Sequence, residues 1–368
     1  MTNRHDYDSI ELMETIQASF DHLIRENPRG EARKDALKLD FDRRLKLEFH
    51  GTKVTSDAGL LAYRELDDAL GLTTMTDSEL CDNRTGKNTQ HSIAALLRQS
   101  IYSRLAGYVD TNDAERLCVD PAMRHVAGGR AIERSAASTS QMGRFETEIL
   151  TQDRNLQCLM NLPGQWVDKA HQRKRIKEII LDMDSSDSPT YGQQEGSAYN
   201  GHLGYTCYHP LFVFNQFGDL ERALLRNGNV HSVDDWQSVL ESIVSRYRDF
   251  NIARFFRGDA AFANPNIYRY LETEDYFYAI RLISNPILHN KIEHLLTRPA
   301  GRPPQKPIFL YHSFQYQAAS WGKSRRVIAK IEWHAGELFP RIGFIVTNLR
   351  WKSSNVVKFY NKRGTAEQ

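Results

Sequence analysis

The sequence lacks any uninterrupted apolar run close to the roughly 20 residues that a membrane-spanning helix requires. Its N-terminus, MTNRHDYDSIELMETIQ, also lacks the basic and then apolar order of a signal peptide. Both absences argue against a membrane partner. They predict a soluble protein that stays in the cytoplasm.

Cysteine is scarce as well, with four residues in 368: Cys81, Cys118, Cys158 and Cys207. They are isolated in the sequence, so a zinc site built on paired cysteines is not expected. We expect reduced thiols instead. The sequence also lacks internal repeats and low-complexity tracts. Its length therefore predicts two or three ordinary globular domains.

Neither sign of charge is in large excess, since the net charge is +2, but the charges are unevenly distributed along the chain. From residue 283 onward there are 14 Lys or Arg and 4 Asp or Glu, a balance of +10, which leaves −8 for the first 282 residues. This asymmetry predicts a C-terminal part that binds a polyanion. A solvated basic face is the alternative.

The N-terminal part is predicted to be helical in two segments. Residues 8–26 place apolar side chains near helical spacing, and residues 1–40 form a helical arm around them. Residues 41–170 keep a helical pattern, in which one helix closes on Gly71 and another opens at Ser138 with a capping box. They predict an all-helical domain.

Arginines near the capped helix could present a recognition helix to DNA, so we predict that residues 41–170 form a DNA-binding domain. They include Arg130, Arg134 and Arg144. Packed helices with exposed arginines would give the same pattern and are the alternative.

The periodicity changes at the basic stretch HQRKRIK. Residues 176–184 form an apolar run that ends in acids, typical of a buried central strand, and a hairpin, a helix, a strand, a helix and a strand follow. The order βββαβαβ with a later helix is that of the ribonuclease H-like fold. We therefore predict an α/β protein with a ribonuclease H-like mixed sheet in residues 171–290, a β-rich insertion in 291–352 and the start of a final helix in 353–368.

Acidic residues fall where such a fold would bring them together. Asp182 and Asp184 lie on one side of the first strand, Asp259 ends a later strand and Glu367 lies in the final helical segment. Two Mg²⁺ ions that clamp the oxygens of a phosphoryl transfer need several such carboxylates on rigid elements. Caps and turns are the alternative role for acids at strand ends.

Three blocks resemble the signature blocks of the DDE transposases of bacterial insertion sequences, in the group 1 DDE family. They are LDMDSSDSPTYGQQEGSAYNG, RGDAAFANP and YNKRGTAEQ. The last block matches the Y-(2)-R-(3)-E pattern through Tyr360, Arg363 and Glu367. The resemblance extends over residues 43–368.

The resemblance implies that Asp184, Asp259 and Glu367 are the catalytic residues and hold two Mg²⁺ ions, for which Mn²⁺ can substitute. Asp182 is the alternative first acid, because LDMDSS offers two.

It also implies contacts to DNA. Trp321 in the β-rich insertion is predicted to stack on a base, and a core tryptophan is the alternative. The predicted DNA-binding residues are Tyr360, Arg363, Trp321, Lys323, Arg325 and Arg326.

The implied function is a DNA transposase. It would bind the terminal inverted repeats and the target DNA as a homodimer and catalyse metal-dependent strand cleavage and strand transfer in the bacterial cytoplasm. The family's signature continues beyond the glutamate to a lysine and a longer helical tail, so we expect a C-terminally truncated chain. The alternatives are a truncated, non-catalytic DNA-binding remnant or inhibitor, and a ribonuclease H-like nuclease without strand transfer.

Overall fold

The chain divides into two compact units between Cys158 and Leu159, as seen in a computed structural model. The predicted helix at residues 8–26 and the predicted ligand Glu367 lie outside the residues that the structure describes. The described residues are 37–39, 41–42, 44–47, 57–85, 89–297 and 306–363.

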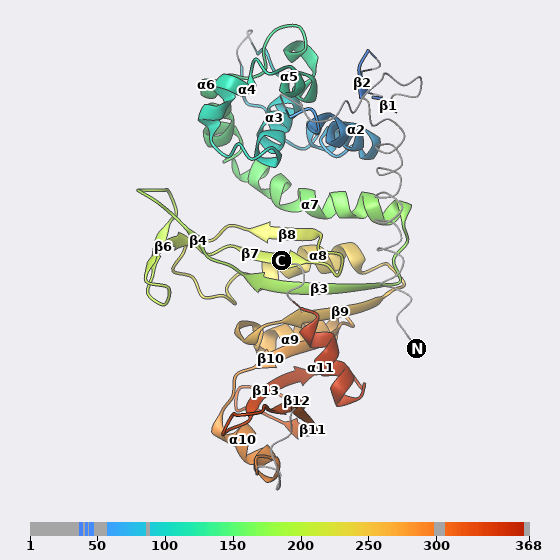
Figure 1. Cartoon of the computed structure of the whole chain (residues 1–368), viewed down its shortest axis with the longest axis vertical. Coiled ribbons are helices and arrows are strands. Elements are labelled where there is room, and N and C mark those ends of the chain that lie inside the picture. The colour runs from blue at the N-terminus through green and yellow to red at the C-terminus, as the bar shows by residue number, and fades with distance from the viewer. Residues whose placement is uncertain are drawn as a thin grey trace. The chain divides into compact units, whose positions relative to one another are not determined.

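The first unit is mainly helical in its described part, and a two-stranded sheet precedes the helices (Figure 1). No helix in the described ranges is both long and apolar enough to cross a membrane. The elements are β1 (Leu37–Lys38), β2 (Lys46–Leu47), α2 (Leu60–Leu70), α3 (Ile93–Leu105), α4 (Ala114–Leu117), α5 (Pro121–Ala127), α6 (Thr139–Arg144) and α7 (Asp153–Arg173), which continues into the second unit.

The helix ends follow the predicted local signals. Gly71 adopts the left-handed conformation with φ of 68°, and its N–H bonds to the carbonyl of Asp67 at the end of α2. Ser138 and Gln141 form the predicted capping box of α6. Both predicted boundaries are confirmed.

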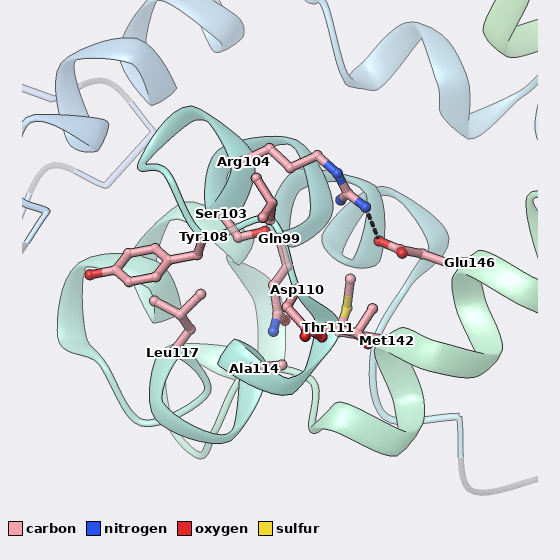
Figure 2. Close-up of a pocket in the computed structure, with 11 residues that line it drawn as sticks. Gln99, Ser103, Arg104, Tyr108, Asp110, Thr111, Ala114, Leu117, Met142 and Glu146 are labelled. Atoms are coloured by element: carbon pink, nitrogen blue, oxygen red, sulfur yellow. Dashed lines mark ion pairs between the residues drawn. The ribbon is translucent and has the colours of Figure 1, made fainter. Parts of the chain in front are cut away.

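A small cavity lies among the helices of this unit (Figure 2). Its volume is about 10 Å³, and the ion pair between Arg104 and Glu146, with 2.8 Å between the charged atoms, lies on its wall. A cavity of this volume holds about one water molecule. It is too small for a substrate.

The second unit is organised around an eight-stranded mixed sheet with the order β11-β12-β13-β10-β9-β3-β7-β8 (Figure 1). The predicted strands and helices between residues 176 and 282 are confirmed, except that residues 205–215, predicted as one strand, form two strands in different sheets, Tyr205–Tyr208 and Leu211–Phe214. The strands are β3 (Glu178–Ser185), β7 (Leu211–Phe214), β8 (Leu220–Leu224), β9 (Ala253–Gly258), β10 (Phe277–Leu282), β11 (Ile308–Tyr316), β12 (Arg325–Trp333) and β13 (Arg341–Thr347).

Three neighbouring strands of this sheet are parallel. β9 pairs in parallel with β3 on one side and with β10 on the other, whereas the remaining neighbours are antiparallel. The carboxyl ends of β3, β9 and β10 therefore meet at one edge of the sheet.

Helices cover the two faces of the sheet unequally. The larger core includes Leu181, Phe256 and Ile280 from the strands together with α8 (Trp236–Tyr247), α9 (Pro265–Thr273) and α10 (Pro286–Ile292). The opposite face packs Phe255 and Ala279 against Val356, Val357 and Phe359 of α11 (Ser353–Asn361). Side chains of one strand alternate between these two cores, as the pleat requires.

The strands predicted as an insertion extend this same sheet. β13 pairs antiparallel with β10, from Ala279 with Thr347 to Leu282 with Phe344, and β12 and β11 continue outward. The domain boundary predicted between residues 290 and 291 stays a prediction.

A three-stranded arm leaves the sheet between β3 and β7, formed by β4 (Ser188–Pro189), β6 (Tyr205–Tyr208) and β5 (Ala198–Asn200) (Figure 1). The Asn200 side chain accepts bonds from the N–H groups of His202 and Leu203 and donates to the carbonyl of Gly228 at 2.7 Å. This asparagine closes the turn and ties the arm to the loop after β8.

Candidate active site

Asp184 and Asp259 lie side by side at the carboxyl edge of the parallel strands. The last registered pair of β3 and β9 is Met183 with Gly258, and each aspartate follows its partner by one residue. Neighbouring strands are about 4.8 Å apart. Asp184 alternates with Met183, and Asp259 follows Gly258 in an extended conformation, so both aspartates fall on the sheet face that α11 covers. We call the end of β3 and β9 that carries them the acidic edge.

Asp184 forms an ion pair with Arg363, with 2.8 Å between Oδ2 and Nη2. Its Oδ1 accepts a hydrogen bond from the N–H of Ser185 at 2.9 Å. The Asp184 side chain is 26% exposed, so solvent still reaches this carboxylate.

Asp259 caps the short helical turn Ala260–Phe262. Its Oδ1 accepts a hydrogen bond from the N–H of Ala261 at 2.8 Å. No hydrogen bond or ion pair to Oδ2 occurs within the described part of the chain, which leaves this oxygen for a cation. The residue before Asp259 is Gly258. A Cβ at this position would come within 3.2 Å of both Phe256 and Phe262, which favours glycine.

Asp182 has a different environment from Asp184. It forms a buried two-pronged ion pair with Arg257, its registered partner on β9, whose Nε lies 2.6 Å from Oδ1. Arg257 also donates from Nη1 to the carbonyl of Phe359 at 2.8 Å. This pair thus ties β3 and β9 to the end of α11, and the geometry favours Asp184 over Asp182 as the first acid.

The helix α11 carries Tyr360 and Arg363 to the acidic edge. Burial raises the pKa of the Tyr360 hydroxyl, Arg363 and Arg281 oppose this rise, and Asp259 adds to it. Arg363 follows the helix in its C-terminal turn.

Trp321 is a core side chain in this structure. It is 5% exposed, and its ring centroid lies 5.4 Å from those of both Tyr268 and Tyr316. A base could stack on it only if the indole left this core. This environment favours the core tryptophan, the alternative to base stacking, and a stacking role for Trp321 stays a prediction.

Three cations that are predicted to bind DNA lie near Trp321 in the sequence. Arg325 is buried and binds both carboxylate oxygens of Glu272, at 2.9 and 3.1 Å. Arg326 donates to the carbonyls of Leu349 and Trp351, at 2.6 and 2.8 Å. Lys323 reaches Glu272 at 3.0 Å but keeps 62% of its side chain exposed. Lys323 is the most exposed of the three, Arg326 is partly buried and Arg325 is buried.

Comparison with known protein families assigns residues 37–368 to the transposase DDE domain group 1. The chain belongs to this family. Comparison with curated proteins found no match.

Among solved structures, the DDE chain is similar to a piggyBac transposase in a synaptic complex with hairpin DNA, studied by cryo-electron microscopy. The two are 12% identical, the match covers 81% of this chain, and the TM-score is 0.41. The chain spans 63% of the length of that transposase.

DDE transposases generally use divalent metal ions, and the acidic edge fits such an ion. Asp184 and Asp259 offer hard oxygen ligands, which Mg²⁺ and Mn²⁺ prefer. Arg363 already places one positive charge against Asp184. No group of three or more His, Cys, Asp or Glu residues that could hold a metal ion occurs in the described ranges, so a third protein ligand would come from outside them.

Two arginines of this site were missed by the sequence analysis. Arg257 lies two residues before Asp259 and therefore on the same face of β9. Arg281 is the second-last residue of the strand YFYAIRL and holds the register position that Asp184 and Asp259 hold on their own strands. A charged residue near the end of a buried strand was the available signal, and it identifies basic residues as well as acids.

Proposed function

We propose that this DDE family member is a DNA transposase. It binds the terminal inverted repeats of a bacterial insertion sequence and the target DNA, cuts the strand end and joins it to the target. The observation that carries this proposal is the placement of Asp184 and Asp259 on adjacent parallel strands, facing a helix that presents Tyr360 and Arg363.

The proposed fold of the second unit is ribonuclease H-like. The strand order β8-β7-β3-β9-β10, with β3, β9 and β10 parallel, supports this assignment, as does α11 after the last strand. The proposed catalytic core is residues 171–290, completed by the helix from residue 353.

In the proposed mechanism, Asp184, Asp259 and Glu367 hold two Mg²⁺ ions, or Mn²⁺ in their place. When bound, these ions would supply Lewis acidity to the attacking and leaving oxygens. Arg363 and Tyr360 bind the phosphate at this edge, because a guanidinium matches its oxygens in a fork and a phenol can donate to them. The Asp182–Arg257 pair positions the end of α11 without touching DNA.

We further propose that residues 41–170 contact DNA. The protein would act as a homodimer in the bacterial cytoplasm. Arg130, Arg134 and Arg144 are exposed in this helical part. Because Lys and Arg displace counterions from DNA, the affinity for duplex DNA should fall steeply with salt. A flat salt dependence would argue against the DNA-binding role of this part and of the basic C-terminal region.

The function is tested with a supercoiled plasmid that carries the DNA flanking the chain's own gene. We expect nicking that requires Mg²⁺. Asp184→Asn or Asp259→Asn should lower it by more than about a hundredfold, since even outer-shell partners of a metal are worth about 10–100-fold. The matched control is Asp249→Asn, the same change at an exposed aspartate beyond α8.

Two results would decide against the proposal. Nicking that survives both acid substitutions would remove the acidic edge from catalysis. DNA binding without nicking by the unsubstituted chain would instead support a non-catalytic DNA-binding protein.

A further inference from the structure

Arg281 continues the row of Asp184 and Asp259 onto a third strand. Gly258 of β9 is registered with Met183 of β3 and also with Ile280 of β10. The residue that follows on each parallel strand is Asp184, Asp259 or Arg281. A fixed positive charge therefore lies one strand from Asp259 and two from Asp184.

Arg281 also lies on the face where the acids point. Ala279 packs in the core beneath α11, whereas Ile280 packs in the opposite core. Because side chains alternate along a strand, Arg281 shares the face of Ala279. Arg281 lowers and Asp259 raises the pKa of the Tyr360 hydroxyl, which agrees with this placement.

The guanidinium of Arg281 has no structural role in the described part of the chain. Arg257 and Arg325 are both buried and bound to carboxylates. Arg281 is exposed, and it forms no hydrogen bond or ion pair with any residue that the structure describes. An arginine on a solvated face that binds nothing would also be exposed and unbound. The surroundings of Arg281 therefore decide whether it has a ligand.

An open pocket of about 390 Å³ adjoins Arg281 and Asp259. Leu282, Ile283 and Phe344 contribute apolar wall to it, and Gly343 leaves one side without a side chain. The volume lies within the range of small-molecule sites, and an apolar pocket with a few charged groups at its mouth is their usual composition. A nucleoside with a charged phosphate matches this combination.

We propose that Arg281 binds a phosphate of the DNA strand that lies at the acidic edge, and that the adjoining pocket receives the sugar and base of the same nucleotide. This inference rests on the proposed function. A phosphate near two carboxylates is repelled unless positive charge neutralises it, and arginine stays charged at every working pH. Its fork of donors can hold two phosphate oxygens at once.

The test uses a short duplex from the DNA that flanks the chain's gene. Each phosphate in turn is replaced by an uncharged methylphosphonate, and affinity is measured by fluorescence anisotropy without metal. We expect Arg281→Ala to weaken binding by about tenfold to hundredfold, as for a hydrogen bond between charged groups. At one position, the methylphosphonate should weaken binding of the unsubstituted protein by the same factor as Arg281→Ala does. At that position it should not weaken binding of the Arg281→Ala variant any further.

Two further variants sharpen the result. Arg281→Lys keeps the charge but loses the fork, so it should recover only part of the affinity. Lys177→Ala removes the same charge from an exposed residue seven positions before Asp184, about 23 Å away along β3. In the Lys177→Ala variant, the methylphosphonate at that position should lower DNA affinity as much as it does in the unsubstituted protein.

The outcomes separate this inference from the proposed function. If no methylphosphonate position loses its effect in Arg281→Ala, Arg281 is a solvated surface residue and the inference is overturned. If Asp259→Asn nicks plasmid as fast as the unsubstituted protein, the proposed function fails, while the anisotropy scan still reports on Arg281.

Discussion

Arg363 and Asp184 form an ion pair at the acidic edge, with 2.8 Å between Nη2 and Oδ2. The guanidinium neutralises the same carboxylate that is proposed to hold a metal ion. A phosphate from DNA would compete for the guanidinium, and Mg²⁺ would compete for the carboxylate.

This competition predicts opposite effects of Arg363→Gln on two ligands. Mg²⁺ should bind the DNA-free protein about threefold more tightly, a factor within the range of a partly exposed ion pair. Affinity for DNA should fall about tenfold. Titration calorimetry measures the first and anisotropy the second, with Lys358→Gln on the exposed face of α11 as the control. Unchanged or weaker Mg²⁺ binding would show that Arg363 does not compete with the metal.

The buried Asp182–Arg257 pair predicts a stability effect. Its side chains are 10% and 4% exposed, so Arg257→Met, which removes the ion-pair partner of a buried carboxylate, should cost about 3–5 kcal/mol. Adding Asp182→Leu should recover most of this loss, because two apolar side chains can replace a buried pair. Calorimetric unfolding measures both. If Asp182→Asn abolished Mg²⁺ binding and left the melting temperature unchanged, Asp182 would be the first metal ligand instead.

Trp321 is predicted to stabilise the fold and to leave DNA affinity unchanged. Trp321→Ala removes a core side chain and should lower the free energy of unfolding by about 3–5 kcal/mol. Trp321→Phe should cost less and keep the DNA affinity of the folded protein. A stable Phe variant that binds DNA tenfold more weakly would restore the stacking prediction.

Gly228 is predicted to tolerate no side chain. A Cβ at this position would lie 2.3 Å from the carbonyl oxygen of Cys207 and 2.4 Å from that of Ala198, and both are backbone atoms that cannot turn away. Gly228→Ala should therefore displace the β5–β6 arm and destabilise the protein. Hydrogen exchange should rise in residues 198–208 and stay unchanged in Gly322→Ala, where nothing lies within 4 Å.

Glu272 predicts a dependence of stability on pH. Burial acts to raise its pKa, but hydrogen bonds from Arg325, Lys323 and Tyr278 outweigh this and hold the pKa below its ordinary value of 4.5. The ionised carboxylate therefore stabilises the fold above about pH 4.5, and this contribution is lost as the pH falls through the lowered pKa. The melting temperatures of the unsubstituted protein and Glu272→Gln should differ most at neutral pH and converge in acid. A difference that stays constant down to pH 3 would contradict this.

Local sequence signals were sufficient to predict several helices and strands of both units. The apolar run before Asp184, the helical spacing from Trp236 to Tyr247 and the capping box at Ser138 each depend on neighbours within a few residues. Periodicity and capping act at that range, so they can be read from the chain itself. The positions of the acids at strand ends followed from the same local signals.

The choice between Asp182 and Asp184 required the register of two strands far apart in sequence. Both acids share one face of β3, and only the pairing with β9 places Arg257 opposite the first and Asp259 beside the second. Register depends on how whole elements pack, which no short segment records.

The surroundings of Trp321 and Arg281 likewise depend on tertiary structure. An aromatic residue between basic ones looks the same in sequence whether it packs inside or meets a ligand, and only the contacts with Tyr268 and Tyr316 place Trp321 in the core. Arg281 lies near the end of its strand like many exposed arginines, and only the parallel pairing aligns it with the two acids. The sequence by itself determined which side chains stand at the strand ends, and the non-local pairing of β3, β9 and β10 determined that three of them share one edge.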